Sequence, residues 1–225
     1  MEKFSSITAK SHLNDVDIPQ TIKDIMSKIK QFGYDIYIVG ETAINLITGG
    51  YIEEYELNTN IPISEIIKYF PQANIEENNE NTITRIEING VKCKIRNSKE
   101  KNLLTEISNK RFTIETIALD ENMKIIDPLN GIKSLYRKEL ALVDKEGTFF
   151  SKTPIEILKT ISTAAKMNFN INENCRKIMT ENKELLNELS GEEIYMEIYK
   201  ILMSDNPSKY IIENKEIIFQ LFPEL

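Results

Sequence analysis

The most constraining feature of this sequence is an apolar, strand-favouring run that stops at a glycine. The run covers residues 36–39 and ends at Gly40, and a short helical segment is predicted over 42–47. After a Gly-Gly pair, the pattern predicts a second short strand over 54–57. A strand, a glycine, a short helix and another strand in this order predict a unit of mixed helix and sheet, organised around residues 34–60.

The second predicted strand carries two acidic residues. Glu54 and Glu56 flank Tyr55, and residues two apart in a strand point to the same face. Two carboxylates side by side can hold a hard cation such as Mg²⁺ next to nucleotide phosphates. The alternative is an acidic strand edge that binds no metal. The residues themselves leave both interpretations open.

Composition describes a folded, acidic protein. The chain has 225 residues, which suffices for one large domain or a domain with an appendage, and 41% of them are hydrophobic. The formal net charge of −7 is unusual for a protein that grips a nucleic-acid backbone. No window is apolar enough to span a bilayer, and the N-terminus lacks the apolar core of a signal peptide, so we expect a cytoplasmic protein with no membrane partner. Cys93 and Cys175 are expected to be free thiols.

Local signals divide the rest of the chain into elements. Residues 1–17 are expected to form a polar lead-in, and Pro19 favours a helix start. Alternating segments flank Asn89-Gly90, which is the strongest short signal for a β-hairpin. From about residue 149 the pattern becomes helical, with a start signal at Thr153-Pro154. Further helices are predicted over 172–189, 192–203 and 207–219.

The stretch 34–60 also resembles the start of the class II nucleotidyltransferases, the family of tRNA CCA-adding enzymes and bacterial poly(A) polymerases. That family has a strand, then GGxVRD, then a strand that carries DxD. In this chain the GGxVRD positions hold Gly40, Glu41, Thr42, Ala43, Ile44 and Asn45. The DxD positions hold Glu54, Tyr55 and Glu56. The spacing of the motifs is kept, and most of their chemistry is changed.

Two later segments resemble the same family. Residues 111–114 stand on the family's RDFT text, with its aspartate replaced by Arg111, and residues 126–131 match the turn that follows. Residues 150–169 resemble the family's neck entry, which contains EDxxR and RFAAxLgF. The resemblance covers roughly residues 18–205, and the motifs occur in the family's order. A shared order of motifs indicates a shared fold.

The resemblance implies an α+β fold. A polymerase-β-like nucleotidyltransferase head, a small mixed sheet with helices, is implied over residues 18–145, and an all-helical neck over 146–225. The family's body and tail domains, which hold tRNA, are expected to be absent. The family transfers nucleotides with two metal ions, so Glu54 and Glu56 are the implied catalytic carboxylates and Mg²⁺ ligands.

Several positions depart from the family's chemistry. Glu41 places bulk and negative charge where the family has a glycine that lets a phosphate approach. Ile44 removes the arginine, and an alkyl group supplies none of its donors. Asn45 replaces the aspartate, and Glu115 adds an acid at the family's asparagine. At the neck entry, the positions of the base-reading acid and arginine hold Lys152, Thr153 and Glu156.

Four residues remain as candidates for nucleotide binding. They are Gly40, Lys110, Arg111 and Lys159. The resemblance implies that Gly40, the first glycine of the motif, lies at the nucleotide site and that Lys159 keeps one charge of the neck's arginine series. Lys110 and Arg111 can meet a phosphate or an RNA backbone, or they can form an ordinary charged turn before a strand. The sequence does not separate these two interpretations.

Two hypotheses about function follow. The first is a catalytically degenerate tRNA nucleotidyltransferase- or poly(A) polymerase-like protein that acts by binding a protein or RNA partner and needs no cofactor. Homodimerisation belongs to this hypothesis, because the C-terminal run 217–222 is rich in apolar residues. The second is an active nucleotidyltransferase that adds nucleotides to an RNA 3′ end with Mg²⁺ on Glu54 and Glu56. The joint loss of glycine, arginine and aspartate favours the first hypothesis.

Overall fold

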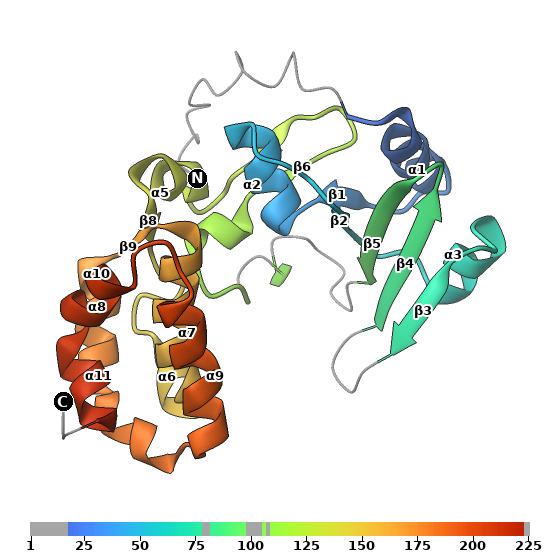
Figure 1. Ribbon diagram of the computed structural model, residues 1–225. Helices are drawn as coiled ribbons and strands as arrows, with labels where there is room; N and C mark the ends of the chain where they lie inside the picture. The colour runs from blue at the N-terminus through green and yellow to red at the C-terminus, as the bar shows by residue number, and fades with distance from the viewer. Residues whose placement is uncertain (1–17, 78–81, 98–104, 107–108, 223–225) are drawn as a thin grey trace. The chain divides into compact units, whose positions relative to one another are not determined.

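The computed structural model describes residues 18–77, 82–97, 105–106 and 109–222 (Figure 1). The chain divides into two compact units. Unit 1 comprises residues 1–110 and 115–131, and unit 2 comprises residues 111–114 and 132–225. The short segment 111–114 therefore belongs to unit 2 although residues on both sides of it belong to unit 1. The domain boundary near residue 145 stays a prediction.

Unit 1 is built on a seven-stranded mixed sheet with the order β3-β4-β5-β2-β1-β6-β7. The strands are β1 (Ile36–Ile38), β2 (Tyr55–Thr59), β3 (Asn74–Glu77), β4 (Thr82–Ile88), β5 (Val91–Asn97), β6 (Ala118–Leu119) and β7 (Ile125–Ile126). β2 and β5 run parallel, and the other strand pairs of this sheet are antiparallel. The parallel register places Glu56 beside Lys94. Two strands that are separated by more than thirty residues in sequence thus become direct neighbours.

The described part of unit 1 contains three α-helices that accompany the sheet. They are α1 (Gln20–Gln31), α2 (Gly40–Thr48) and α3 (Ile63–Tyr69). α1 begins directly after Pro19 and buries its apolar stripe, formed by Ile22, Ile25, Met26 and Ile29. The predicted start of this helix is confirmed. Phe32, just past its end, stacks on Tyr69 of α3 with ring centroids 3.8 Å apart.

The hairpin predicted at Asn89-Gly90 is confirmed. β4 and β5 pair antiparallel, and the turn residues have positive φ angles of 53° at Asn89 and 77° at Gly90. Two consecutive positive φ angles are what a type I′ turn requires, and Asn-Gly adopts them at low cost. The turn fixes the register of β5, and β5 carries the basic residues that face β2.

Unit 2 is mainly helical. Its helices are α5 (Gly131–Arg137), α6 (Thr148–Lys152), α7 (Ile155–Met167), α8 (Glu173–Glu181), α9 (Gly191–Leu202), α10 (Pro207–Glu213) and α11 (Lys215–Leu221), with the 3₁₀ segment η3 (Lys183–Glu188). Another 3₁₀ segment, η2 (Thr113–Thr116), crosses the border between the units. The strands β8 (Glu139–Leu140) and β9 (Asn170–Ile171) pair in parallel. The α+β class expected from the sequence is confirmed.

The longest helix of unit 2, α7, supplies the centre of its core. It buries Ile157, Leu158, Ile161, Ala164 and Ala165, the stripe that the helical spacing predicts. α7 packs against α6, α9 and α10. Among the described residues, we find no helix that combines the length and the apolar character of a membrane span.

Two long predicted helices are shorter in the structure. The helix predicted over 172–189 is wrong in its second half, because α8 gives way at Asn182 to η3. The helix predicted over 207–219 is interrupted at Asn214, whose side chain donates to the carbonyl of Tyr210 at 2.7 Å. Asparagine side chains compete with the helix backbone for hydrogen bonds, which favours a break.

α7 and α9 share a buried polar contact. Glu197 of α9 is only 4% exposed. Ser162 Oγ on α7 donates to Glu197 Oε2 at 2.5 Å, and Lys200 Nζ donates to Oε1 at 2.6 Å. A buried carboxylate is costly unless it is hydrogen-bonded, so these two donors offset the cost of burying Glu197.

Removing one of these donors is expected to destabilise unit 2. We expect Ser162→Ala to lower the free energy of unfolding by about 1–3 kcal/mol, because it leaves a buried carboxylate oxygen with fewer donors. Urea unfolding followed by helical circular dichroism measures this loss. Ser208→Ala, at an exposed position of α10, is the matched control and should have no effect. Equal stability of the Ser162→Ala variant and the wild type would contradict the structural role of this contact.

Cysteine labelling is expected to report on the two units separately. Cys93 lies on β5 in unit 1 and Cys175 on α8 in unit 2, and both are buried free thiols. Burial raises the pKa of each thiol to about 12, so the reactive thiolate is scarce. Native protein should react with a thiol reagent only through opening of the unit that holds the cysteine. Mass spectrometry of Cys93→Ser and Cys175→Ser variants, labelled in increasing urea, gives the opening of each unit. Rapid labelling without urea would contradict the burial.

Candidate functional site

The candidate site of unit 1 is a pocket of about 280 Å³ beside the start of β2. Its lining consists of Glu41, Thr42, Asn45, Tyr51, Ile52, Glu53, Glu54 and Glu56. Half of these residues are glutamates, and none of them is basic. The two implied metal ligands of the sequence therefore line one pocket, in the company of two more carboxylates.

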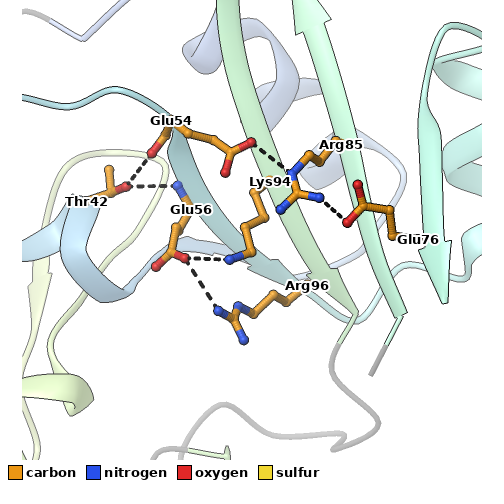
Figure 2. Close-up of polar contacts among 7 residues, drawn as sticks. All are labelled: Thr42, Glu54, Glu56, Glu76, Arg85, Lys94 and Arg96. Atoms are coloured by element: carbon orange, nitrogen blue, oxygen red, sulfur yellow. Dashed lines mark hydrogen bonds and ion pairs between the residues drawn. The ribbon is translucent and has the colours of Figure 1, made fainter. Parts of the chain in front are cut away.

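The first turn of α2 is tied to the strand that carries these acids. Thr42 is buried, and its Oγ1 donates to the carbonyl of Glu54 at 3.2 Å and accepts the amide of Glu56 at 2.8 Å (Figure 2). The amide of Val39 also donates to the carbonyl of Glu56 at 3.0 Å. These bonds hold the backbone of residues 54–56 in place, so the positions of the two carboxylates are set by the fold.

Glu56 is already neutralised within the chain. Its Oε1 accepts from Lys94 Nζ at 3.1 Å and from Arg96 Nη2 at 3.4 Å (Figure 2). Burial by itself raises the pKa of Glu56, but the hydrogen bond and charge of Lys94, followed by those of Arg96, outweigh it and hold the pKa below its usual range. The carboxylate is therefore ionised near neutral pH, and its charge is balanced by two tethered cations.

The other oxygen of Glu56 lies against Gly40. Gly40 opens α2 with a positive φ of 64°, and a β-carbon built on it would collide with Oε2 of Glu56. The positive φ favours glycine at this position, and a side chain here would also displace the end of the Glu56 side chain. The space over the α-carbon of Gly40 is filled by the carboxylate of Glu56.

Glu54 is also paired with a cation. Its Oε1 accepts from Arg85 Nε at 3.2 Å, and Arg85 contacts Glu76 through Nη1 (Figure 2). Ion pairs link neighbouring strands on this face: Glu76 of β3 pairs with Arg85 of β4, and Lys94 of β5 pairs with Glu56 of β2. Arg85 also reaches across β5 to Glu54, which directly precedes β2, and we call this set of ion pairs the charge ladder.

The remaining candidate cations each have an acidic partner in their own unit. In unit 1, Lys110 Nζ lies 3.5 Å from Glu106 Oε1. In unit 2, Glu156 accepts from Arg111 and, at 3.0 Å, from Lys159. Burial raises the pKa of Glu156, yet the hydrogen bond of Lys159 and the charge of Arg111 hold it below its usual range. That these three cations bind a nucleotide stays a prediction.

Lys94 and Arg96, the basic residues beside the pocket, are not among the site residues predicted from the sequence. Lys94 and Arg96 belong to a segment whose alternation marks it as a strand, and that alternation does place both on one face. Their pairing with Glu56 could not be predicted, because the alternation does not indicate which strand lies next to β5. A parallel pairing between distant strands has no local signal.

The donor set does not fit a pair of divalent ions. Within the described ranges, no group of three or more His, Cys, Asp or Glu residues is arranged to hold a metal. Of the two expected ligands, Glu56 is bound by two cations and Glu54 by one. A metal ion at either carboxylate has to compete with side chains that the sheet itself supplies. No chemical step through a metal is therefore derived.

Comparisons with known proteins find similarity to CCA-adding enzymes and to a polymerase-associated segment. Residues 168–225 match a family model described as "Probable RNA and SrmB- binding site of polymerase A". The chain is 27% identical over 202 residues to CCA-adding enzymes of Streptococcus pyogenes serotypes M2 and M5. The match covers 83% of this chain and 50% of each relative, so the chain spans about half the length of these curated relatives.

Solved structures share the fold. The CCA-adding enzyme of Bacillus stearothermophilus in complex with CTP aligns with a TM-score of 0.77 at 22% identity, over 87% of this chain and 51% of that one. The Thermotoga maritima CCA-adding enzyme complexed with tRNA aligns with a TM-score of 0.77 at 18% identity, over 96% of this chain and 55% of that one. In sequence and in fold, the chain is therefore similar to CCA-adding enzymes and poly(A) polymerases, over a part that corresponds to their head and neck region.

Proposed function

We propose that this tRNA nucleotidyltransferase-like protein acts by binding a protein or RNA partner and does not add nucleotides. The charge of the pocket carries this proposal. Glu41, Glu53, Glu54 and Glu56 line it, and a nucleoside triphosphate is a polyanion. Like charges about 4 Å apart repel by about 1 kcal/mol in water and by about 4 kcal/mol where solvent is partly excluded. Arg85, Lys94 and Arg96 offset part of the charge of Glu54 and Glu56. None of the residues that line the pocket is basic, so the lining itself supplies no cation for a triphosphate.

The ion pairs that the key side chains already form also support the proposal. Nucleotidyl transfer needs carboxylates that are open to metal ions and cations that are open to phosphates. Here Glu56 carries Lys94 and Arg96, and Glu156 carries Arg111 and Lys159. Each charge that the reaction would use is balanced by another charge of the chain, while the surrounding sheet and helices are intact.

A nucleotide-incorporation assay tests this proposal. We expect no extension of RNA 3′ ends when the protein is incubated with each labelled nucleoside triphosphate and Mg²⁺ or Mn²⁺. A double variant, Glu54→Gln with Glu56→Gln, should behave like the wild type. An active CCA-adding enzyme is the positive control for the RNA and the nucleotides. Incorporation that disappears in the double variant would establish the alternative, a metal-dependent nucleotidyltransferase that uses these two carboxylates.

The charge of residues 168–225, the segment that matches the family model, helps to decide between a protein partner and RNA. The name of the family model and the tRNA complex of a relative support an RNA partner. However, residues 168–225 contain eleven acidic and six basic residues. Affinity for a nucleic-acid backbone comes mainly from basic side chains that neutralise phosphates. This balance favours a protein partner over RNA.

A surface on α9 suits a protein partner. Five apolar side chains at helical spacing are exposed there; we call them the α9 stripe, formed by Tyr195, Met196, Tyr199, Leu202 and Met203. Tyr195 is 62% exposed and Met203 is 67% exposed. Aromatic residues and methionine are enriched in protein interfaces, and a contiguous exposed apolar patch marks an interaction site. The apolar C-terminal run is a weaker candidate, because Ile217 and Ile218 are buried.

Self-association is the form of partner binding that the chain can test alone. By light scattering, we expect a dimer fraction that rises with protein concentration, because pairing of two stripes removes apolar surface from water. Tyr195→Ser with Tyr199→Ser should weaken the dimer at least tenfold, about 1.4 kcal/mol. Tyr136→Ser, another exposed tyrosine of unit 2, is the matched control.

The opposite outcome is equally clear. If the protein is a strict monomer and shifts a tRNA in a gel at physiological salt, the partner is RNA and the electrostatic argument for a protein is wrong. A steep loss of that shift with added salt would identify phosphate contacts as its source.

A further inference from the structure

We propose that Lys94 and Arg96 are built-in counter-cations, which hold Glu56 in place of divalent ions. This inference rests on the proposed non-catalytic function, and it explains how the pocket keeps its carboxylates without a metal. It assigns a positive role to two residues of β5 that the sequence motifs do not include.

Register is the first argument. Parallel pairing sets Lys94 opposite Glu56 and Arg96 opposite Asn58, so both cations point to the face that carries the carboxylate. The hairpin turn at Asn89-Gly90 joins β5 to β4, so β5 is held between β4 and β2. The cations are thus delivered by the backbone and need no separate binding event, which gives them a high local concentration at Glu56.

Coordination of Glu56 is the second argument. Oε1 accepts from both Lys94 and Arg96, and Oε2 lies over Gly40 (Figure 2). The side chains of Glu56 and Lys94 are only 20% and 16% exposed. A divalent ion that displaced Lys94 would leave a largely buried ammonium without its acceptor. Leaving one member of a buried ion pair without its partner costs free energy, so this cost lowers the affinity of Glu56 for a metal ion.

The pocket itself is the third argument. Glu56 shares it with Glu41, Glu53 and Glu54. Carboxylate oxygens are the ligands that Mg²⁺ and Mn²⁺ prefer. Without the charges of Lys94 and Arg96, Glu56 would lack its counter-cations, and a divalent ion would be the natural replacement. Glu54 would keep its partner Arg85, so Glu56 would be the main ligand.

The test is Mn²⁺ binding, measured from the electron paramagnetic resonance signal of the free ion. The double variant Lys94→Met with Arg96→Met removes both charges and keeps apolar stems of similar length. We expect it to bind Mn²⁺ at least tenfold more tightly than the wild type, about 1.4 kcal/mol. Adding Glu56→Gln to the double variant should abolish the gain. Circular dichroism confirms that each variant is folded.

A matched control separates tethering from net charge. Lys92 lies on the same strand and is exposed, and no ion pair between it and Glu56 is found. Lys92→Met removes one positive charge from β5, as Lys94→Met does. Only Lys94→Met should improve Mn²⁺ binding. An equal gain from both variants would show that general electrostatics, and not the pairing with Glu56, controls metal binding.

Other outcomes would overturn the inference directly. One is wild-type protein that binds Mn²⁺ as tightly as the double variant; another is a folded double variant that gains no affinity. If the double variant does not fold, the wild type still provides the test, since Mn²⁺ at millimolar concentration should leave the amide signals of Gly40 and Thr42 unbroadened in nuclear magnetic resonance spectra. Broadening there would refute the inference. Nucleotide incorporation by the wild type would refute the proposed function instead, so the two failures are distinguishable.

Discussion

The parallel pairing of β2 with β5 decides the chemistry of unit 1, because it sets carboxylates of one strand against cations of the other. Glu56 lies beside Lys94 in this register, and Arg96 follows two residues on. Around this pair, the ladder extends through Arg85 to Glu54 and Glu76. Adjacent strands are under about 5 Å apart, so side chains that lie opposite each other on one face of the sheet are in contact. On its other side, Glu56 lies against Gly40, and its amide donates to Thr42 of α2.

The fold and the site have separate physical requirements. The core needs apolar side chains at helical spacing. The chain has them, because the apolar stripes of α1 and α7 are buried. The site needs particular charges at particular atoms, and these differ from the family's motifs at Glu41, Ile44 and Arg111. A scaffold tolerates such exchanges because the stability of the core does not depend on them. The α+β architecture shared with CCA-adding enzymes is therefore compatible with a different use of the pocket.

In unit 2, too, carboxylates pair with donors of the same unit, here on helices. Arg111 and Lys159 meet on Glu156 near the start of α7, and Ser162 and Lys200 meet on the buried Glu197 farther along the same helix. Each carboxylate is satisfied by its own unit. α9 turns Glu197 and Ile201 inward and presents Tyr195 and Tyr199 to solvent. A helix that buries an acid and exposes aromatic rings inverts the usual pattern, and the exposed rings are what a partner can use.

The sequence by itself determined the elements with strong local signals: the helix after Pro19, the hairpin at Asn89-Gly90, the buried stripe of α7 and the α+β class. Periodicity and turn chemistry depend on residues that are close in sequence, so they can be recognised from the sequence alone. The sequence also singled out Glu54 and Glu56 as a pair. Only the tertiary structure decided what those carboxylates hold. Lys94 and Arg85 reach them from strands more than thirty residues away, and no local pattern encodes which strands become neighbours. The breaks at Asn182 and Asn214 were likewise hidden, because side-chain competition with the backbone depends on the packing around each asparagine.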